Sequence, residues 1–324
     1  MVCPPRMYGC CLRPERWPAA HCLLSGWLCQ RQAQVSVLTG TSACLTVSQH
    51  IGEGHHDRRA RSMPTATQSW VEEFIDVGGT RTHILKGGSG APLLVLHGAL
   101  GNPGWLPYHE ALAQHCTVYA PSHPGYDQTP RPPWVSTIAD VAHFYLGLMR
   151  ALGLERPTIM GFSMGGWIAA ELAAMRSDRL RGLILVNAVG IKPHGDTPIA
   201  EVLMAPPEEV QKLAYYDPSK VPAAPTLSPE AAAVQWSNRE MASRLCWKPY
   251  MHNPKLPDYL RLIRVPALIV WGRQDRIVPY VCGEMYHEAL QGSTLHPIDQ
   301  CGHAPQTEQP EVFLDITSKF LATL

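Results

Sequence analysis

The chain has 324 residues, with 27 basic and 27 acidic side chains, so it carries no net formal charge. This balance excludes a protein that binds nucleic acid through a general excess of positive charge. Its 45% apolar and 17% charged residues are typical of a globular protein with a large core and exclude a disordered or fibrous chain. No apolar run reaches the roughly 18 to 20 residues of a transmembrane helix, so no membrane span is expected.

Residues 1–62 differ in composition from the rest of the chain. They hold six of the ten cysteines and seven arginines against three acidic residues, whereas the rest of the chain has a net charge of −4. This segment shows no apolar period typical of a helix or a strand, and it lacks the layout of a secretory signal peptide. A transit peptide, a disulfide-bonded or metal-binding extension, and an upstream segment outside the functional protein are the possible interpretations. We favour the last, with Met63 as the start of a cytoplasmic protein whose few remaining cysteines stay reduced.

From residue 70 onward, strand and helix patterns alternate. Two strand patterns flank Gly78-Gly79, which predicts a hairpin because glycines adopt the positive φ of tight turns. Continuous apolar runs, typical of strands buried on both faces, follow at 93–96, 117–120, 158–161, 183–186 and 267–270. Apolar residues that recur three and four positions apart predict a helix over 137–152. Helices or longer segments separate most of the buried strands, so we expect an α/β fold with a doubly wound, mostly parallel sheet.

The interval between the strands that end near residue 187 and begin near residue 266 is too long for a single crossover. It exceeds seventy residues, is rich in proline and aromatic residues, and has helical patterns of its own at 208–215 and 229–245. We therefore interpret residues 191–263 as a helical lid inserted over a core made of residues 63–190 and 264–324.

Ser163 lies in the string Gly161-Phe162-Ser163-Met164-Gly165-Gly166, between a predicted strand and a predicted helix. A serine on such a sharp strand-to-helix turn has an exposed hydroxyl, and the flanking glycines leave room for the strained backbone. The string alone also occurs in ordinary glycine-rich turns, and the strand-turn-helix context is what favours a nucleophile.

A nucleophilic serine needs a base, and the base needs a carboxylate to orient it. His303 follows the predicted strand 294–298, and Asp275 follows the strand 267–270, so both are expected at the same end of the sheet as Ser163. Asp275 could instead cap the next helix or pair with a nearby arginine, and Asp299 is a second acid close to His303. We favour Asp275.

The oxyanion formed at an attacked carbonyl needs preorganised hydrogen-bond donors. We expect the backbone amides of Met164, which begins the helix after Ser163, and of Ala99, in the glycine-rich loop after the strand 93–96. The remaining histidines show no spacing typical of metal ligands, so no metal is expected. We expect no cofactor of another kind either.

From about residue 70 to its end, the chain resembles the α/β-hydrolase superfamily, in the branch with a lid. The resemblance rests on several motifs that together are specific for the superfamily: His97-Gly98, Pro124-Gly125-Tyr126, the Ser163 string, the segment 266–279 around Asp275, and Gly302-His303. The chain order of serine, aspartate and histidine is also that of the superfamily. The Gly-x-Ser-Met-Gly-Gly string is similar to that of bacterial carboxylesterases.

The resemblance implies a serine hydrolase that cleaves small to medium carboxylic esters through an acyl-enzyme, with water as the second substrate. Haloalkane dehalogenases and epoxide hydrolases carry an aspartate in place of Ser163, so the serine argues against these two groups. Meta-cleavage C–C hydrolases typically have asparagine and tryptophan where this chain has Phe162 and Ala304. A C–C hydrolase of this type, a cofactor-free perhydrolase and a non-catalytic ligand-binding protein on the same fold stay open as alternatives. The sequence indicates neither the physiological substrate nor the oligomeric state.

Overall fold

The structure is a computed structural model that describes residues 69–195, 197–221 and 227–324. The expectations for residues 1–62 lie outside the described residues. All described residues belong to one unit, Met63–Leu324, whose strands and helices are therefore described together.

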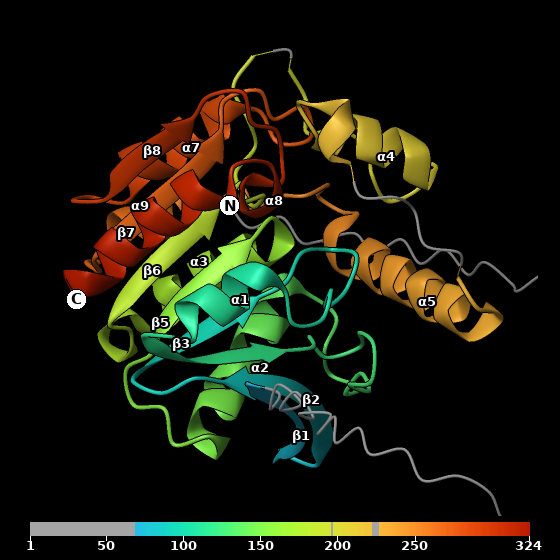
Figure 1. The fold of residues 1–324 in the computed structure, drawn as a ribbon, viewed down its shortest axis with the longest axis vertical. Coiled ribbons are helices and arrows are strands. Elements are labelled where there is room, and N and C mark those ends of the chain that lie inside the picture. Colours follow the sequence, from blue (N-terminus) through green and yellow to red (C-terminus); the bar gives the residue numbers. More distant parts are fainter. Residues whose placement is uncertain (1–68, 196, 222–226) are drawn as a thin grey trace, which may run out of the picture. The chain divides into compact units, whose positions relative to one another are not determined.

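Eight strands form a single sheet in the order β1-β2-β4-β3-β5-β6-β7-β8 (Figure 1). Their bounds are β1 (Trp70–Val77), β2 (Thr80–Gly87), β3 (Ala91–Leu96), β4 (Cys116–Pro121), β5 (Thr158–Phe162), β6 (Gly182–Val186), β7 (Ala267–Gly272) and β8 (Thr294–Ile298). The expected hairpin is β1 with β2, and β2 is also antiparallel to β4. All later neighbours are parallel. The strand order reverses around β3, and α/β sheets bind ligands at the carboxyl ends of the strands beside such a reversal.

The apolar runs are continuous because both faces of the sheet are covered. In β3, Leu94 and Leu96 belong to a core cluster shared with α2 (Ile138–Ala151) and α3 (Met164–Arg176). Leu93 and Val95 point the other way, into a cluster with residues of α1 (Pro107–Leu112) and α9 (Pro310–Ala322). Successive side chains of a strand face opposite sides, so a strand between two helical layers is apolar at every position.

The expected helix at 137–152 is α2, and a capping box fixes its start. The Thr137 hydroxyl accepts a hydrogen bond from the Asp140 amide at 3.1 Å, and the Asp140 carboxylate accepts one from the Thr137 amide at 2.9 Å. The other helices of the core are η1 (Ser177–Arg179), α7 (Tyr280–Ala289) and α8 (Pro305–Glu308).

The segment between β6 and β7 contains helices of its own: α4 (Pro207–Ala214), η2 (Pro218–Lys220), α5 (Pro229–Cys246) and α6 (Leu256–Arg261). The two helices expected in this interval thus occur as α4 and α5, which Figure 1 shows beyond the right-hand side of the sheet. Helix α6 packs against α3 and α7 instead. None of the described helices is both long and apolar enough to cross a membrane.

Candidate active site

Ser163 joins β5 to α3 in a backbone conformation that side chains rarely adopt, with φ of 51° and ψ of −114°. Its amide donates to the Val186 carbonyl at 2.9 Å, and its own carbonyl accepts from the Val189 amide at 3.2 Å. These bonds tie the turn to the end of β6. A positive φ at a serine costs free energy of order 1–3 kcal/mol, which the surrounding structure must offset.

The two glycines that flank Ser163 are needed because the turn passes very close to other backbone. A Cβ atom at Gly161 would overlap the Gly165 carbonyl, and one at Gly165 would overlap the Leu96 carbonyl. Side chains at either position would push α3 away from the sheet and displace Ser163. The structure therefore gives the glycine spacing of the string a steric cause.

His303 and Asp275 come together from the loops after β8 and β7. The Nδ1 atom of His303 lies 2.7 Å from Oδ2 of Asp275. The other carboxylate oxygen, Oδ1, accepts hydrogen bonds from the Ile277 and Val278 amides at 2.8 and 2.9 Å. The Asp275 side chain is fully buried, so these bonds compensate for its desolvation. Because the carboxylate accepts from Nδ1, the unprotonated nitrogen of a neutral His303 is Nε2.

Asp299, the second acid considered, lies elsewhere. Its side chain is 75% exposed and pairs with Arg273, at 2.7 Å between Nε and Oδ1. Of the two acids, the structure brings Asp275 to His303.

Asn187 is a further residue of this cluster, and the sequence analysis did not single it out. Its Nδ2 donates to Oδ2 of Asp275 at 2.5 Å and to the Gly302 carbonyl at 3.2 Å. It directly follows β6, has a positive φ of 45° and is buried. An asparagine at the carboxyl end of a continuous apolar strand was the only signal of its position.

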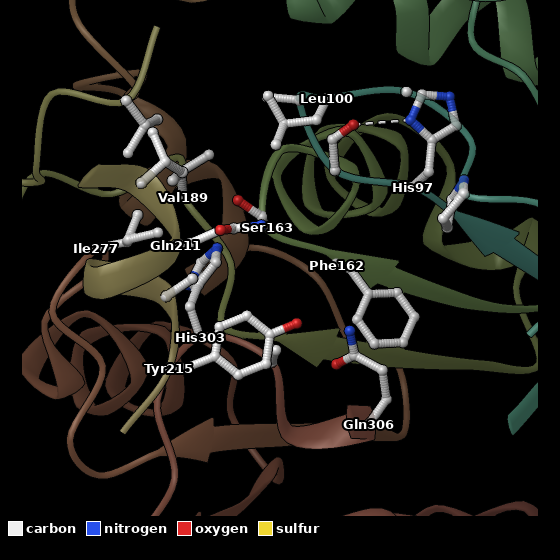
Figure 2. Close-up of a pocket in the computed structure, with 18 of the residues that line it drawn as sticks. His97, Leu100, Phe162, Ser163, Val189, Gln211, Tyr215, Ile277, His303 and Gln306 are labelled. Carbon is white, nitrogen blue, oxygen red and sulfur yellow. Dashed lines mark hydrogen bonds between the residues drawn. The ribbon is translucent and has the colours of Figure 1, made fainter. Parts of the chain in front are cut away.

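Ser163 and His303 line the same cavity of about 370 Å³ (Figure 2). Ala99 lines it as well. Its wall is largely apolar and includes Leu100, Val189, Ile199, Val202, Val210 and Ile277. Polar side chains are few, with Gln211, Tyr215 and Gln306 among them. No lysine, arginine, aspartate or glutamate is among the described residues that line it.

The backbone amides of Ala99 and Met164 are the two expected oxyanion donors. Within the described residues, neither the Ala99 amide nor the Met164 amide donates a hydrogen bond to another protein group. The loop that carries Ala99 passes close to the serine, since a Cβ atom at Gly98 would lie 3.6 Å from the Ser163 Cβ. Unpartnered amides beside a serine hydroxyl can bind the oxygen of an attacked carbonyl.

A buried histidine pair fixes the loop after β3. The His97 Nδ1 donates to the Gly98 carbonyl at 2.7 Å, and its Nε2 accepts from the His123 amide at 3.0 Å. The His123 Nε2 donates to the His97 carbonyl at 2.9 Å, while its Nδ1 accepts from the Tyr145 hydroxyl. Each ring thus donates from one nitrogen and accepts at the other, which requires the neutral form. Burial lowers the pKa of His97 to about 4, and burial and then the neighbouring His97 hold the pKa of His123 well below its usual range.

No cluster of three or more histidine, cysteine, aspartate or glutamate side chains suited to a metal ion occurs in the described part of the chain.

A sequence profile described as the alpha/beta hydrolase family matches residues 93–316. The chain belongs to the alpha/beta hydrolase family. The expected fold class is thereby confirmed, as is the coarser expectation of a hydrolase.

The proteins to which this hydrolase is similar carry names of different activities. This chain is 27% identical over 283 residues to a 2-hydroxy-6-oxo-2,4-heptadienoate hydrolase of Pseudomonas putida, and the match covers 80% of this chain and 99% of the relative. Among solved structures, it resembles a membrane phospholipase A with a TM-score of 0.68 and 24% identity, over 79% of this chain and 86% of that one. It also resembles a naproxen esterase of Bacillus subtilis with a TM-score of 0.63 and 18% identity, over 78% and 91% of the two chains. The two structural likenesses concern the fold.

Proposed function

We propose that this hydrolase cleaves small to medium carboxylic esters through an acyl-enzyme on Ser163. The observation that carries the proposal is that Ser163 lines the same apolar cavity as His303. The Nδ1 atom of this histidine bonds to the Asp275 carboxylate. This grouping supports the roles of a serine nucleophile, its base and an orienting carboxylate.

The reaction would run in two halves. The Ser163 Oγ attacks the ester carbonyl carbon while His303 Nε2 takes the hydroxyl proton, and Asp275 stabilises the imidazolium. The amides of Ala99 and Met164 bind the oxyanion. The intermediate collapses as His303 returns the proton to the departing alcohol. Water then attacks the acyl-enzyme with His303 again as base, and the acid leaves as Ser163 recovers its proton.

We further propose that residues 191–263 act as a lid. Val210, Gln211 and Ala214 of α4 form part of the cavity wall, so α4 limits the access of water to the serine. In a cavity this apolar, the acyl chain or alcohol of the ester is bound mainly by hydrophobic contact.

The cavity wall also bears on the choice between esters and C–C bonds. The Pseudomonas relative is named for a dienoate, a substrate that carries a carboxylate. Burying a carboxylate in an apolar cavity is unfavourable unless a cation pairs with it, and the described lining residues supply no lysine or arginine. This favours uncharged esters, while the similarity to the relative keeps C–C hydrolysis as the second candidate.

A matched pair of substrates tests the proposal. We expect kcat/KM for a p-nitrophenyl alkanoate to exceed that for the same ester with a terminal carboxylate on the acyl chain by at least about tenfold, which corresponds to about 1.4 kcal/mol. Ser163→Ala should abolish turnover, whereas Ser177→Ala, at the other end of α3, should not change it. Faster cleavage of a dienoate diketone than of any ester, seen as loss of its absorbance, would contradict the ester assignment.

A further inference from the structure

Glu308 is a buried acidic residue five positions after His303 that the reaction above does not use. It ends α8 and is 1% exposed. Its Oε1 accepts a hydrogen bond from the Gly302 amide at 2.6 Å, and its Oε2 accepts from the amides of Tyr216 and Asp217 at 2.7 and 3.2 Å. A buried carboxylate is stable only with such charge-assisted bonds, so the three amides are held to it strongly.

The three amides belong to two separate parts of the molecule. Gly302 immediately precedes His303, whereas Tyr216 and Asp217 follow α4, the helix that forms part of the cavity wall. The carboxylate therefore links the loop of the proposed base to the segment that covers the cavity.

Further contacts at the same junction bring the two parts together. The His303 amide donates to the Ala214 carbonyl, the last of α4, at 2.6 Å. A Cβ atom at Gly302 would lie only 2.5 Å from that carbonyl oxygen, so the contact requires glycine. Arg276, next to Asp275, donates to the Lys212 carbonyl at 2.6 Å and also to the Tyr215 carbonyl. The last carbonyls of a helix lack partners within it, and here the loops of the base and the acid supply them.

We propose that Glu308 is a positioning residue that sets the His303 imidazole towards Ser163 and couples this placement to the seating of α4 over the cavity. The inference rests on the proposed function, because it assigns His303 the role of base. It follows that a substrate that presses against α4 also bears on the loop of His303. Closure of the cavity and alignment of the base are then one event.

Glu308→Gln tests the role with little change in volume. The single amide oxygen can accept from Gly302 or from the Tyr216–Asp217 pair, and its NH2 group then faces the donors on the other side. We expect kcat for a p-nitrophenyl ester to fall about 10- to 100-fold with KM changed less than about threefold, as for a misplaced catalytic group. Glu311→Gln, an exposed neighbour on α9, is the matched control and should leave both constants unchanged.

Two readouts separate positioning from mere stability. Folded Glu308→Gln, verified by circular dichroism at the assay temperature, should lose most of its rate of fluorophosphonate labelling at Ser163. Hydrogen exchange should rise both at 302–303 and at 216–217, since the carboxylate joins them. A folded variant with kcat within twofold of wild type, or with faster exchange in only one of the two segments, would overturn the proposal.

The exchange experiment does not depend on turnover. If the wild-type protein neither hydrolyses esters nor reacts with the fluorophosphonate, the proposed function fails, and so does the assignment of His303 as the base that Glu308 positions. If the wild-type protein is active and Glu308→Gln matches it, only the role of Glu308 is refuted.

Discussion

The carboxylate of Asp275 and the imidazole of His303 meet at 2.7 Å although they are 28 positions apart in the sequence. The contact forms because β7 and β8 are parallel neighbours whose carboxyl ends lie at the same edge of the sheet. Asp275 lies in the loop after β7 and His303 in the loop after β8, so the pairing of the strands brings the two side chains together.

Asp275→Asn should reduce kcat by about 10³- to 10⁴-fold, as loss of the orienting carboxylate does in serine hydrolases. The carboxylate accepts bonds from His303, from Asn187 and from two backbone amides, and an amide NH2 would face one of these donors. Asp299→Asn, the exposed acid paired with Arg273, is the control. Steady-state ester hydrolysis measures both, and equal losses in the two variants would contradict the assignment.

Replacement of Asn187 should lower activity less, by about 10- to 100-fold, because the side chain supports Asp275 without touching substrate. Alanine at a φ of 45° adds backbone strain of order 1 kcal/mol, whereas glycine adds none. Asn187→Gly should therefore be more stable than Asn187→Ala in thermal unfolding and equally slow in turnover. Full activity in the glycine variant would show that Asn187 only relieves strain.

Gly165→Ala should destabilise the fold by roughly 3 kcal/mol and abolish most activity, since the new methyl group would overlap the Leu96 carbonyl. Gly147→Ala in α2 is the comparison, because its methyl group would meet only a Val77 methyl at 3.2 Å and alanine favours a helix. Urea unfolding of both variants checks the difference. A Gly165→Ala protein as stable and active as wild type would mean that the turn does not need its glycine.

Stability should fall as the pH drops from 6.5 to 5. Burial lowers the pKa of His97 and of His109 to about 4 from the ordinary 6.5, so the unfolded chain binds more protons than the folded chain between these values. The contribution of each histidine to the free energy of unfolding is therefore fully present above pH 6.5 and is lost as the pH falls towards 4. At pH 5 the loss is about 2 kcal/mol per histidine. Urea unfolding at pH 7 and pH 5 measures the change. If NMR of the folded protein showed that the imidazoles of His97 and His109 titrate near pH 6.5, this explanation would be contradicted.

Much of the fold was predictable because strand burial leaves a pattern of residue types. The runs that became β3 to β7 are apolar at nearly every position, and Ser163 and Asp275 each follow such a run. His303 follows β8, a half-exposed strand in which apolar and polar residues mix. Parallel pairing then brings their loops to one edge. Polar residues in the loops after these strands are therefore what predicted the candidate site from the sequence.

The supporting residues could not be predicted in the same way. The carboxylate of Glu308 accepts its short hydrogen bonds from backbone amides, and any residue except proline supplies such a donor. Its partners at 216–217 are some ninety positions away, in a segment whose helices were expected but whose docking was not. The Ala99 amide, by contrast, was expected from the place of its glycine-rich loop after the strand 93–96, and its side chain carries no signal.

The identity of the nucleophile is tested most directly by incubating the purified protein with a fluorophosphonate and mapping the product by mass spectrometry. The account predicts one adduct per chain, on Ser163, formed at a rate that matches the loss of ester hydrolysis. It also predicts no adduct in Ser163→Ala. An adduct on another residue, or continued ester hydrolysis by protein that is fully labelled at Ser163, would contradict it.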